Sequence, residues 1–191
     1  MIKVELMNTM KLIKPSCEYA EQIIEYCDEF YSGGGKAIFD GGDRVQGMAR
    51  IESFDDPVDW IENCRLYEKR DTIPNREHTA ATQYLTIRES DNRIVGAIQF
   101  RHELIGDELR NFGGHIGFSI RPSERRKGYA KEQLRLCLEK AQQYGLDKVM
   151  LCCVNTNEGS RQTILANGGK YESTIFGEKS RLYVRRYWIE L

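Results

Sequence analysis

The spacing of apolar residues changes near residue 83, and this change constrains the fold more than any other feature of the sequence. Before it, apolar residues recur at helical spacing, which predicts two amphipathic helices. Asp56-Pro57 marks the start of the second helix, because Asp is a favoured N-cap and proline fits the first helical position. The predicted buried stripes are Ala20, Ile23, Ile24, Cys27 and Tyr31 in the first helix, and Trp60, Ile61, Cys64 and Tyr67 in the second.

After the change, apolar and polar residues alternate in three runs, at 82–89, 93–104 and 115–122. Such alternation is typical of strands with one buried face, and the turn residues Asp91-Asn92 and Gly113-Gly114 separate the runs. A short apolar run at 10–14 ends at a proline and predicts another strand. Together these runs predict a sheet that is mostly antiparallel.

The last third of the sequence alternates helices and strands. An amphipathic helix begins near Ala130 and ends at Gly145, a residue suited to the left-handed position after a helix. The apolar run 148–154 predicts a buried strand, 158–167 a helix, and 170–191 a closing pair of strands. Since there is no internal repeat and no linker, the sequence predicts one α/β domain over residues 1–191.

Composition excludes several classes of protein. The chain has 28 Lys and Arg against 29 Asp and Glu, a formal net charge of −1, which argues against a general nucleic-acid or anionic-membrane binder. No apolar run is long enough to cross a bilayer and no signal peptide is evident, so we expect a cytoplasmic protein. The six cysteines form no CxxC pair, so no metal site is expected and they are interpreted as reduced core residues.

The segment 120–131 leaves a strand, turns at Pro122 and enters the strongest helix of the chain. A helix N-terminus presents unpaired N–H groups and positive potential, which suit an anion. The small residues at 128 and 130 would let phosphate oxygens approach the backbone, and four basic side chains add charge. The segment therefore indicates a diphosphate site. The alternative, a solvated basic first turn, is less favoured because basic residues there oppose the helix dipole.

The stretch IRPSERRKGYA resembles the acetyl-CoA signature of the GCN5-related N-acetyltransferase (GNAT) family. In that signature, Arg or Gln is followed by two residues, Gly, one residue, and Gly or Ala. The run from Asn157 to the paired glycines at 168–169 is similar to the family's second cofactor segment. The stretches GGHIGFSIRPSERRKGYA and RYWIEL are also similar to those of a group of bacterial acetyltransferases.

This resemblance covers nearly the whole chain and implies a single-domain GNAT-like α/β fold. Its sheet would be mixed, mostly antiparallel, splayed at the cofactor site and flanked by helices. Residues 1–80 would form the acceptor side and residues 81–191 the acyl-CoA-binding core. The acceptor would be a small-molecule amine or a protein amine, and a homodimer is compatible with the fold.

The resemblance also implies roles for individual residues, with acetyl-CoA as acyl donor. One strand would pair with the pantetheine arm and polarise the thioester carbonyl, the basic turn would cradle the pyrophosphate, and a second helix start would contact the pantetheine. The residues implied are Phe118, Ser119 and Ile120; Arg125, Arg126, Lys127, Gly128, Tyr129, Ala130 and Lys131; and Asn157 and Ser160.

Family members usually transfer the acyl group by direct attack of a neutral amine. His115 is the candidate base, because an imidazole titrates near neutral pH and some relatives carry a glutamate base nearby. The equal alternative is a strand-edge histidine without a catalytic task; His102 and Glu103 are weaker candidates. The tyrosine acid of many relatives corresponds here to Ile164, and Tyr171 could replace it only if the chain folds back.

Three further features of the sequence allow other interpretations. The alternative function is a non-catalytic acyl-CoA-binding regulatory module, which the missing tyrosine favours. A nucleic-acid-binding module has only the basic turn in its support. The glycine-rich stretch 32–42 indicates a surface loop, or less strongly a lid over the substrate.

Overall fold

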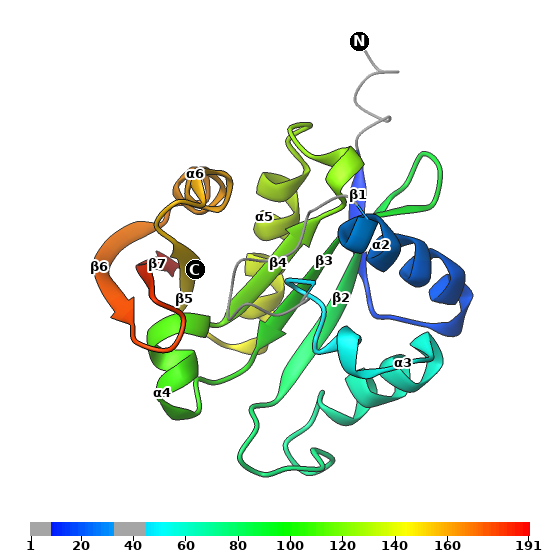
Figure 1. The fold of residues 1–191 in the computed structure, drawn as a ribbon, viewed down its shortest axis with the longest axis horizontal. Helices are drawn as coiled ribbons and strands as arrows, with labels where there is room; N and C mark the ends of the chain where they lie inside the picture. Colours follow the sequence, from blue (N-terminus) through cyan, green and yellow to red (C-terminus); the bar gives the residue numbers. More distant parts are fainter. Residues whose placement is uncertain (1–8, 33–44) are drawn as a thin grey trace.

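The computed structural model describes residues 9–32 and 45–191, and its strands form two sheets (Figure 1). The first has the order β1-β2-β3-β4 and is antiparallel throughout. The second has the order β5-β7-β6 and is also antiparallel. The strands are β1 Met10–Ile13, β2 Ala81–Arg88, β3 Arg93–Arg101, β4 Ile116–Ile120, β5 Lys148–Val154, β6 Lys170–Gly177 and β7 Leu182–Glu190. Every strand predicted from the sequence is present.

The four predicted helices are also confirmed. They are α2 Ala20–Ser32, α3 Pro57–Leu66, α5 Tyr129–Tyr144 and α6 Glu158–Ala166. Asp56 caps α3, since its side chain accepts a hydrogen bond from the N–H of Val58 at 2.7 Å. Short helical turns join the larger elements: η2 Cys17–Tyr19, η3 Ile51–Ser53, α4 Gly106–Glu108, η4 Leu109–Gly113 and η5 Pro122–Glu124.

The connection between β3 and β4 differs from the expected simple turn at Gly113-Gly114. α4 and η4 occupy residues 106–113, and η4 lies against β5 and β7. These two turns are too short to show a helical period in the sequence, which is why the pattern indicated only a glycine turn.

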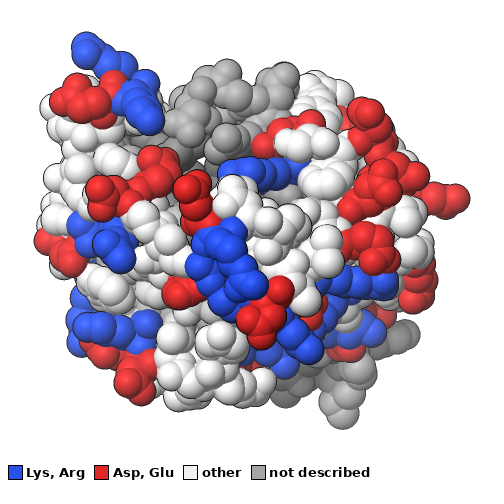
Figure 2. All heavy atoms as spheres, turned by 90° about the horizontal axis from the view of Figure 1, so that it is seen from below, with Lys and Arg blue, Asp and Glu red and all other residues white. Residues whose placement is uncertain are grey.

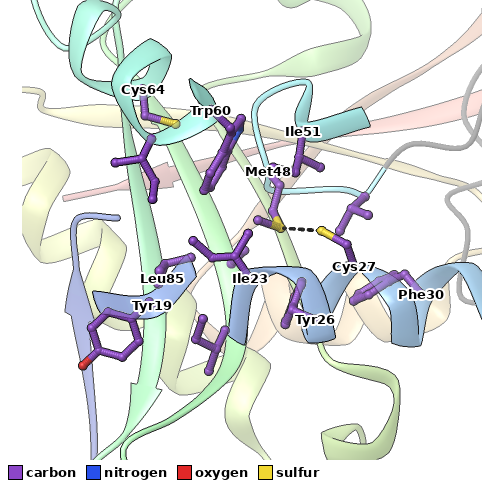
Figure 3. Close-up of a cluster of buried hydrophobic side chains, with 14 of the residues drawn as sticks. Tyr19, Ile23, Tyr26, Cys27, Phe30, Met48, Ile51, Trp60, Cys64 and Leu85 are labelled. Carbon is purple, nitrogen blue, oxygen red and sulfur yellow. Dashed lines mark hydrogen bonds between the residues drawn. The ribbon is translucent and has the colours of Figure 1, made fainter. Parts of the chain in front are cut away.

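The predicted stripe of α2 was wrong at two positions. Ile24 and Tyr31 are 48% and 37% exposed, whereas Tyr26 and Phe30 are fully buried. The buried positions 23, 26, 27 and 30 follow the spacing of one helix face, and Ile24 and Tyr31 lie beside that face. Figure 3 shows this face packing against Met48 and Ile51, with the Cys27 thiol 4.0 Å from the Met48 sulfur.

Two hydrophobic cores lie on opposite faces of the first sheet. One core joins α2 and α3 to the face that carries Ala97, and we call this the α2 face. The other joins α5 and the second sheet to the face that carries Ile98, and we call this the α5 face. Because side chains alternate along a strand, each residue of β3 and β4 can be assigned to one face.

All six cysteines are free, as expected. Cys27, Cys64, Cys137 and Cys153 are buried, but Cys17 is exposed and Cys152 is only partly buried, so the core interpretation was wrong for these two. Cys153 belongs to the core on the α5 face, whereas the thiol of Cys152 contacts the carbonyl of Asn111 at 3.8 Å.

Strands β4 and β5 belong to different sheets, and the hydrogen-bonded contact between them joins the residues just before β4 to the middle of β5. The contact consists of an isolated bridge between Gly114 and Leu151 and a hydrogen bond from the His115 N–H to the Met150 carbonyl at 2.7 Å. Gly114 has φ +71°, and a Cβ there would lie 2.6 Å from the Met150 oxygen. This close approach therefore requires glycine, and beyond it the two strands separate.

The described surface carries both signs of charge. Figure 2 shows Lys and Arg side chains interspersed with Asp and Glu on one face, with acidic side chains denser at one side. Within residues 9–32 and 45–191, no helix is long and apolar enough to cross a membrane. The same residues contain no group of three or more His, Cys, Asp or Glu placed to hold a metal ion.

Candidate active site

Among the described residues, no strand pairs with the edge of β4 that faces β5. The main-chain N–H of Arg101 donates to the His115 carbonyl, and the main-chain N–H of Arg121 donates to the Val95 carbonyl. The main-chain groups of the odd-numbered residues of β4 are therefore bonded to β3. Main-chain groups alternate along an antiparallel strand. The N–H and C=O groups of Phe118 and Ile120 therefore point to the other edge, where the sheets have separated. An extended ligand can pair there without displacing a strand.

Ser119 lies on the α2 face of β4, and its side chain is committed to the protein. Its hydroxyl donates to the carbonyl of Gln46 and accepts from the hydroxyl of Tyr26 at 2.9 Å. Burial raises the pKa of Tyr26, so this phenol stays protonated and donates. Ser119 thus joins α2 and the segment 45–49 to β4. Its main chain, like that of the other odd-numbered residues of β4, is directed to β3, so the free edge is provided by Phe118 and Ile120 and not by Ser119.

The segment 45–49 lies directly on the α2 face. Gly47 has φ +77°, and a Cβ there would lie 2.8 Å from the Phe118 Cα and would clash with the Ala97 carbonyl. The side chain of Gln83 donates to the Gly47 carbonyl at 2.6 Å and accepts from the Ala49 N–H at 3.1 Å. This segment therefore forms a fixed wall above β4.

The turn before α5 has the backbone of an anion site. Gly128 has φ +87° with open space beside it, and Arg126 also has a left-handed φ of +66°. In the described part of the chain, the N–H groups of Lys127, Gly128 and Ala130 donate to no backbone carbonyl. Unpaired amides at a helix start fit a phosphate group.

The side chains around this turn are less free than the sequence suggested. The Arg125 guanidinium lies 5.4 Å from the Phe30 ring centroid and points toward α2. The Lys127 ammonium contacts the Glu124 carboxylate at 2.8 Å. Tyr129 is buried and accepts from Arg88. Arg126 and Lys131 are exposed and make no ion pair within the described residues, so they are the charges available to an anion.

The second predicted segment begins α6. The Asn157 side chain caps this helix by accepting from the Ser160 N–H at 3.0 Å. The other end of α6 reaches the turn at 125–131 that is predicted to bind the cofactor. The Asn167 side chain donates to the Lys131 carbonyl of this turn at 3.2 Å. The two segments predicted to bind the cofactor are therefore linked through α6, although Asn157 and Ser160 do not contact the turn itself.

His115 lies where β4 and β5 separate. Its Nδ1 accepts a hydrogen bond from the Met150 N–H at 2.9 Å, and its side chain is buried. Burial, reinforced by the positive charge of Arg101, lowers the pKa of His115 to about 4. At neutral pH the ring is neutral with its proton on Nε2, because the Nδ1 lone pair is engaged. Base catalysis by His115 stays a prediction and requires this bond to break.

The other residues considered for proton transfer lie elsewhere. Ile164 is fully buried in the α5-side core. β6 does fold back on β7, but Tyr171 is 59% exposed and its hydroxyl bonds to Thr174 at 2.9 Å. His102 stacks on the Tyr144 ring at the far end of α5, and Glu103 pairs with Arg70 at 3.8 Å.

Several buried polar residues that position the site were missed from the sequence. Gln133 of α5 donates to Thr86 at 2.7 Å and to the Ser119 carbonyl at 3.4 Å, and Arg101 and Gln83 approach β4 from β3 and β2. The sequence signal for such residues is a polar residue within an otherwise apolar run, because a buried polar group needs a hydrogen-bond partner. The run does not indicate which distant residue that partner is.

Within the described residues, a strand edge without a partner strand and a helix start with unpaired amides occur at the same side of the molecule. A model of the acetyltransferase (GNAT) family matches residues 46–166. The chain belongs to the GNAT family. The match spans η3 to α6 and includes both predicted cofactor segments. No curated protein matches the sequence.

Solved structures show that the fold of this GNAT chain is shared over almost its full length. The microcin C7 self-immunity acetyltransferase MccE, in complex with acetyl-CoA and AMP, has a TM-score of 0.68 at 14% identity, covering 98% of this chain and 95% of its own. A Salmonella typhimurium acetyltransferase that modifies the N-terminal serine of ribosomal protein L7/L12 has 0.67 at 13%, covering 97% of each. A Bacillus anthracis GNAT acetyltransferase has 0.61 at 17%, covering 96% of each.

Proposed function

We propose that this GNAT chain transfers an acetyl group from acetyl-CoA to a primary amine by direct attack. The observation that carries the proposal is the continuity of the site. The free edge of β4 at Phe118 and Ile120 leads into a turn in which, among the described residues, the amides of Lys127, Gly128 and Ala130 donate to no backbone carbonyl. An extended pantetheine arm fits the strand edge and a pyrophosphate fits the turn. The structure of MccE with acetyl-CoA supports this choice of donor.

The chain's own groups supply positioning and polarisation. A main-chain N–H of Phe118 or Ile120 would donate to the thioester oxygen, where negative charge develops in the transition state. The amine nitrogen forms the new bond to the acyl carbon as the carbon–sulfur bond breaks. The amine proton passes to water or a base, and the thiolate takes a proton from solvent. Phe118, Ile120 and the turn 125–131 bind and orient the donor, while the α2 face receives the acceptor.

Calorimetric titration tests donor binding first. We expect acetyl-CoA to bind with micromolar affinity and 3′,5′-ADP to bind more weakly, since it lacks the pantetheine that would pair with β4. Absence of acetyl-CoA binding at high micromolar ligand would overturn the proposal. An amine library with detection of free thiol then tests transfer, because each turnover releases one coenzyme A.

The second candidate is a non-catalytic acyl-CoA-binding module of the same fold. It is favoured by the burial of Ile164 at the position where many family members carry a tyrosine acid. The same two assays separate the candidates: a binding module takes up acetyl-CoA but releases no thiol with any amine. The acceptor's identity is the subject of the next proposal, and a homodimer along a sheet edge stays a prediction.

A further inference from the structure

Arg101, the last residue of β3, is a partly buried cation beside the point where β4 and β5 separate. Its side chain is on the α2 face, because Ala97 and Arg101 share that face by alternation. The guanidinium is tethered from one end: Nη1 donates to the carbonyl of Gly114 at 2.9 Å and to that of Gly113 at 3.4 Å. The side chain is therefore held in one orientation.

The opposite edge of the guanidinium is unused. Nε and Nη2 make no hydrogen bond within the described residues, and no Asp or Glu among those residues pairs with Arg101. Burial lowers the pKa of Arg101 to about 10, so the group is still charged at neutral pH. A cation that is partly desolvated without a counter-charge is costly to keep. The Nε–Nη2 edge is the one that matches the two oxygens of a carboxylate.

The unused edge lies next to the strand proposed to hold the acyl group. A Cβ on Gly117 would be 3.5 Å from Nη2 and 3.8 Å from Nη1, so the missing side chain leaves space against the guanidinium. Gly117 directly precedes Phe118, and neighbouring Cα atoms are about 3.8 Å apart. An anion bound to Arg101 would thus be a few ångströms from the thioester.

We propose that Arg101 binds a carboxylate of the acceptor, so that the substrates are amines with a carboxylate a few bonds away, such as free amino acids. This inference rests on the proposed function and names its acceptor class. Arg101 is a specificity-determining residue that touches the substrate through its Nε–Nη2 edge. Gly117 provides the room, and the carbonyls of Gly113 and Gly114 fix the direction of the guanidinium.

The test compares matched acceptors. The twenty L-amino acids, their C-terminal amides and their decarboxylated amines are assayed by thiol release at saturating acetyl-CoA. For the best acceptor, we expect kcat/KM for the acid to exceed that for the amide at least about 10-fold, the usual size of a charge-assisted pair. Equal rates for acid and amide, or turnover of amines without carboxylates only, would overturn the inference and leave acetyl transfer intact.

Variants locate the effect. Arg101→Gln should lower kcat/KM for the acid about 10- to 100-fold, abolish the preference over the amide, and leave the KM for acetyl-CoA unchanged. Arg101→Lys, which keeps the charge but lacks the paired N–H groups, should be intermediate. Gly117→Ala should raise only the acceptor KM. The matched control is Arg110→Gln, because Arg110 is exposed and, within the described part of the chain, its side chain bonds only to the Leu104 carbonyl at 3.2 Å.

A binding experiment decides the inference without turnover. N-acetyl amino acids and their amides are titrated into the folded protein with and without coenzyme A. Binding of the acids, its loss in Arg101→Gln and its retention in Arg110→Gln support a carboxylate site. Equal binding of acids and amides, or no binding of either, overturns it. Failure of acetyl-CoA to bind would count against the proposed function, and the separate acetyl-CoA titration described above registers that result.

Discussion

The imidazole Nδ1 of His115 accepts a hydrogen bond from the backbone N–H of Met150 at 2.9 Å, while the His115 N–H donates to the Met150 carbonyl at 2.7 Å. This reciprocal pair joins the two sheets at their last common point before the strands separate.

Removal of the His115 imidazole leaves the buried N–H of Met150 without an acceptor. We expect His115→Ala to lower the free energy of unfolding by about 1–3 kcal/mol. His115→Asn, whose side-chain oxygen restores an acceptor, should recover part of the lost free energy of unfolding. Urea titrations of the two variants measure this difference. Equal losses in both variants would contradict the pairing.

The same histidine makes stability depend on pH. Burial lowers its pKa in the folded protein to about 4, against 6.5 in the unfolded chain, so unfolding takes up a proton between these values. This contribution to stability is complete above pH 6.5 and is lost as the pH falls toward 4. Melting curves from pH 7.5 to 4 should decline less steeply for His115→Asn than for the wild type. Parallel curves would contradict the assigned shift.

The pH–rate profile tests His115 as base. The Nδ1 lone pair of His115 is engaged by the Met150 N–H, and the pKa of the ring is about 4. We therefore expect the kcat/KM of His115→Asn to fall at the same pH as that of the wild type when the two are compared above pH 5.5. Disappearance of a limb near pH 6–7 in the variant would instead establish His115 as the base. The profile thus separates the catalytic role from the structural one.

Gly128 is expected to be essential for donor binding. Glutamate there would place bulk and negative charge in the open space beside the unpaired amides, and we expect the Kd for acetyl-CoA to rise about 10- to 100-fold. The matched control is Gly145→Glu at the other end of α5, where φ is also left-handed at +103° with open space around it. Both variants carry similar backbone strain, so equal Kd values in calorimetry would remove the pyrophosphate assignment.

Glu124 should hold the cofactor turn in place. Its buried carboxylate accepts from Arg88 and Lys127, each at 2.8 Å, which joins the turn to the end of β2. Burial raises the pKa of Glu124, but these hydrogen bonds outweigh it and the net pKa is lowered. We expect Glu124→Gln to cost about 1–3 kcal/mol of stability at pH 7, with little difference from the wild type well below pH 4.5.

The control for Glu124 is Glu132→Gln, because Glu132 forms only solvent-exposed pairs with Arg135 on the same helix. Exposed pairs contribute little, so this variant should change stability by less than about 1 kcal/mol. Chemical denaturation at pH 7 and at a pH well below 4.5 measures both variants. A loss of equal size in the two would contradict the anchoring role of Glu124.

Gly47 should be required for the wall above β4. A methyl group there would clash with the Ala97 carbonyl in a backbone conformation that side chains rarely adopt, so we expect Gly47→Ala to cost about 2–4 kcal/mol. Gly159→Ala is the control, since its Cβ would meet only the Asn157 Oδ1 at 3.7 Å within α6. That change should leave stability equal or slightly higher. Thermal melts of the two variants compare them directly.

The sequence predicted the elements well because local signals determine them. The change of period near residue 83, the Asp56 cap and the glycine at position 145 each act within a few residues, and the structure confirms the helices and strands they indicate. The errors occurred where burial depends on distant partners. Ile24 and Tyr31 of α2 are as apolar as their neighbours, and only the position of the segment 45–54 decides which face is covered.

By itself, the sequence determined the order of the elements and the chemistry of the turn at 125–131, since a glycine at a helix start and its basic neighbours are local properties. Only the tertiary structure decided how those groups are used. Lys127 pairs with Glu124, Ser119 with Tyr26, and His115 with Met150, because residues distant in the sequence meet where the sheets separate. Among the described residues it also left Arg101 without a counter-charge, since an ion pair depends on which charged groups the fold brings within reach.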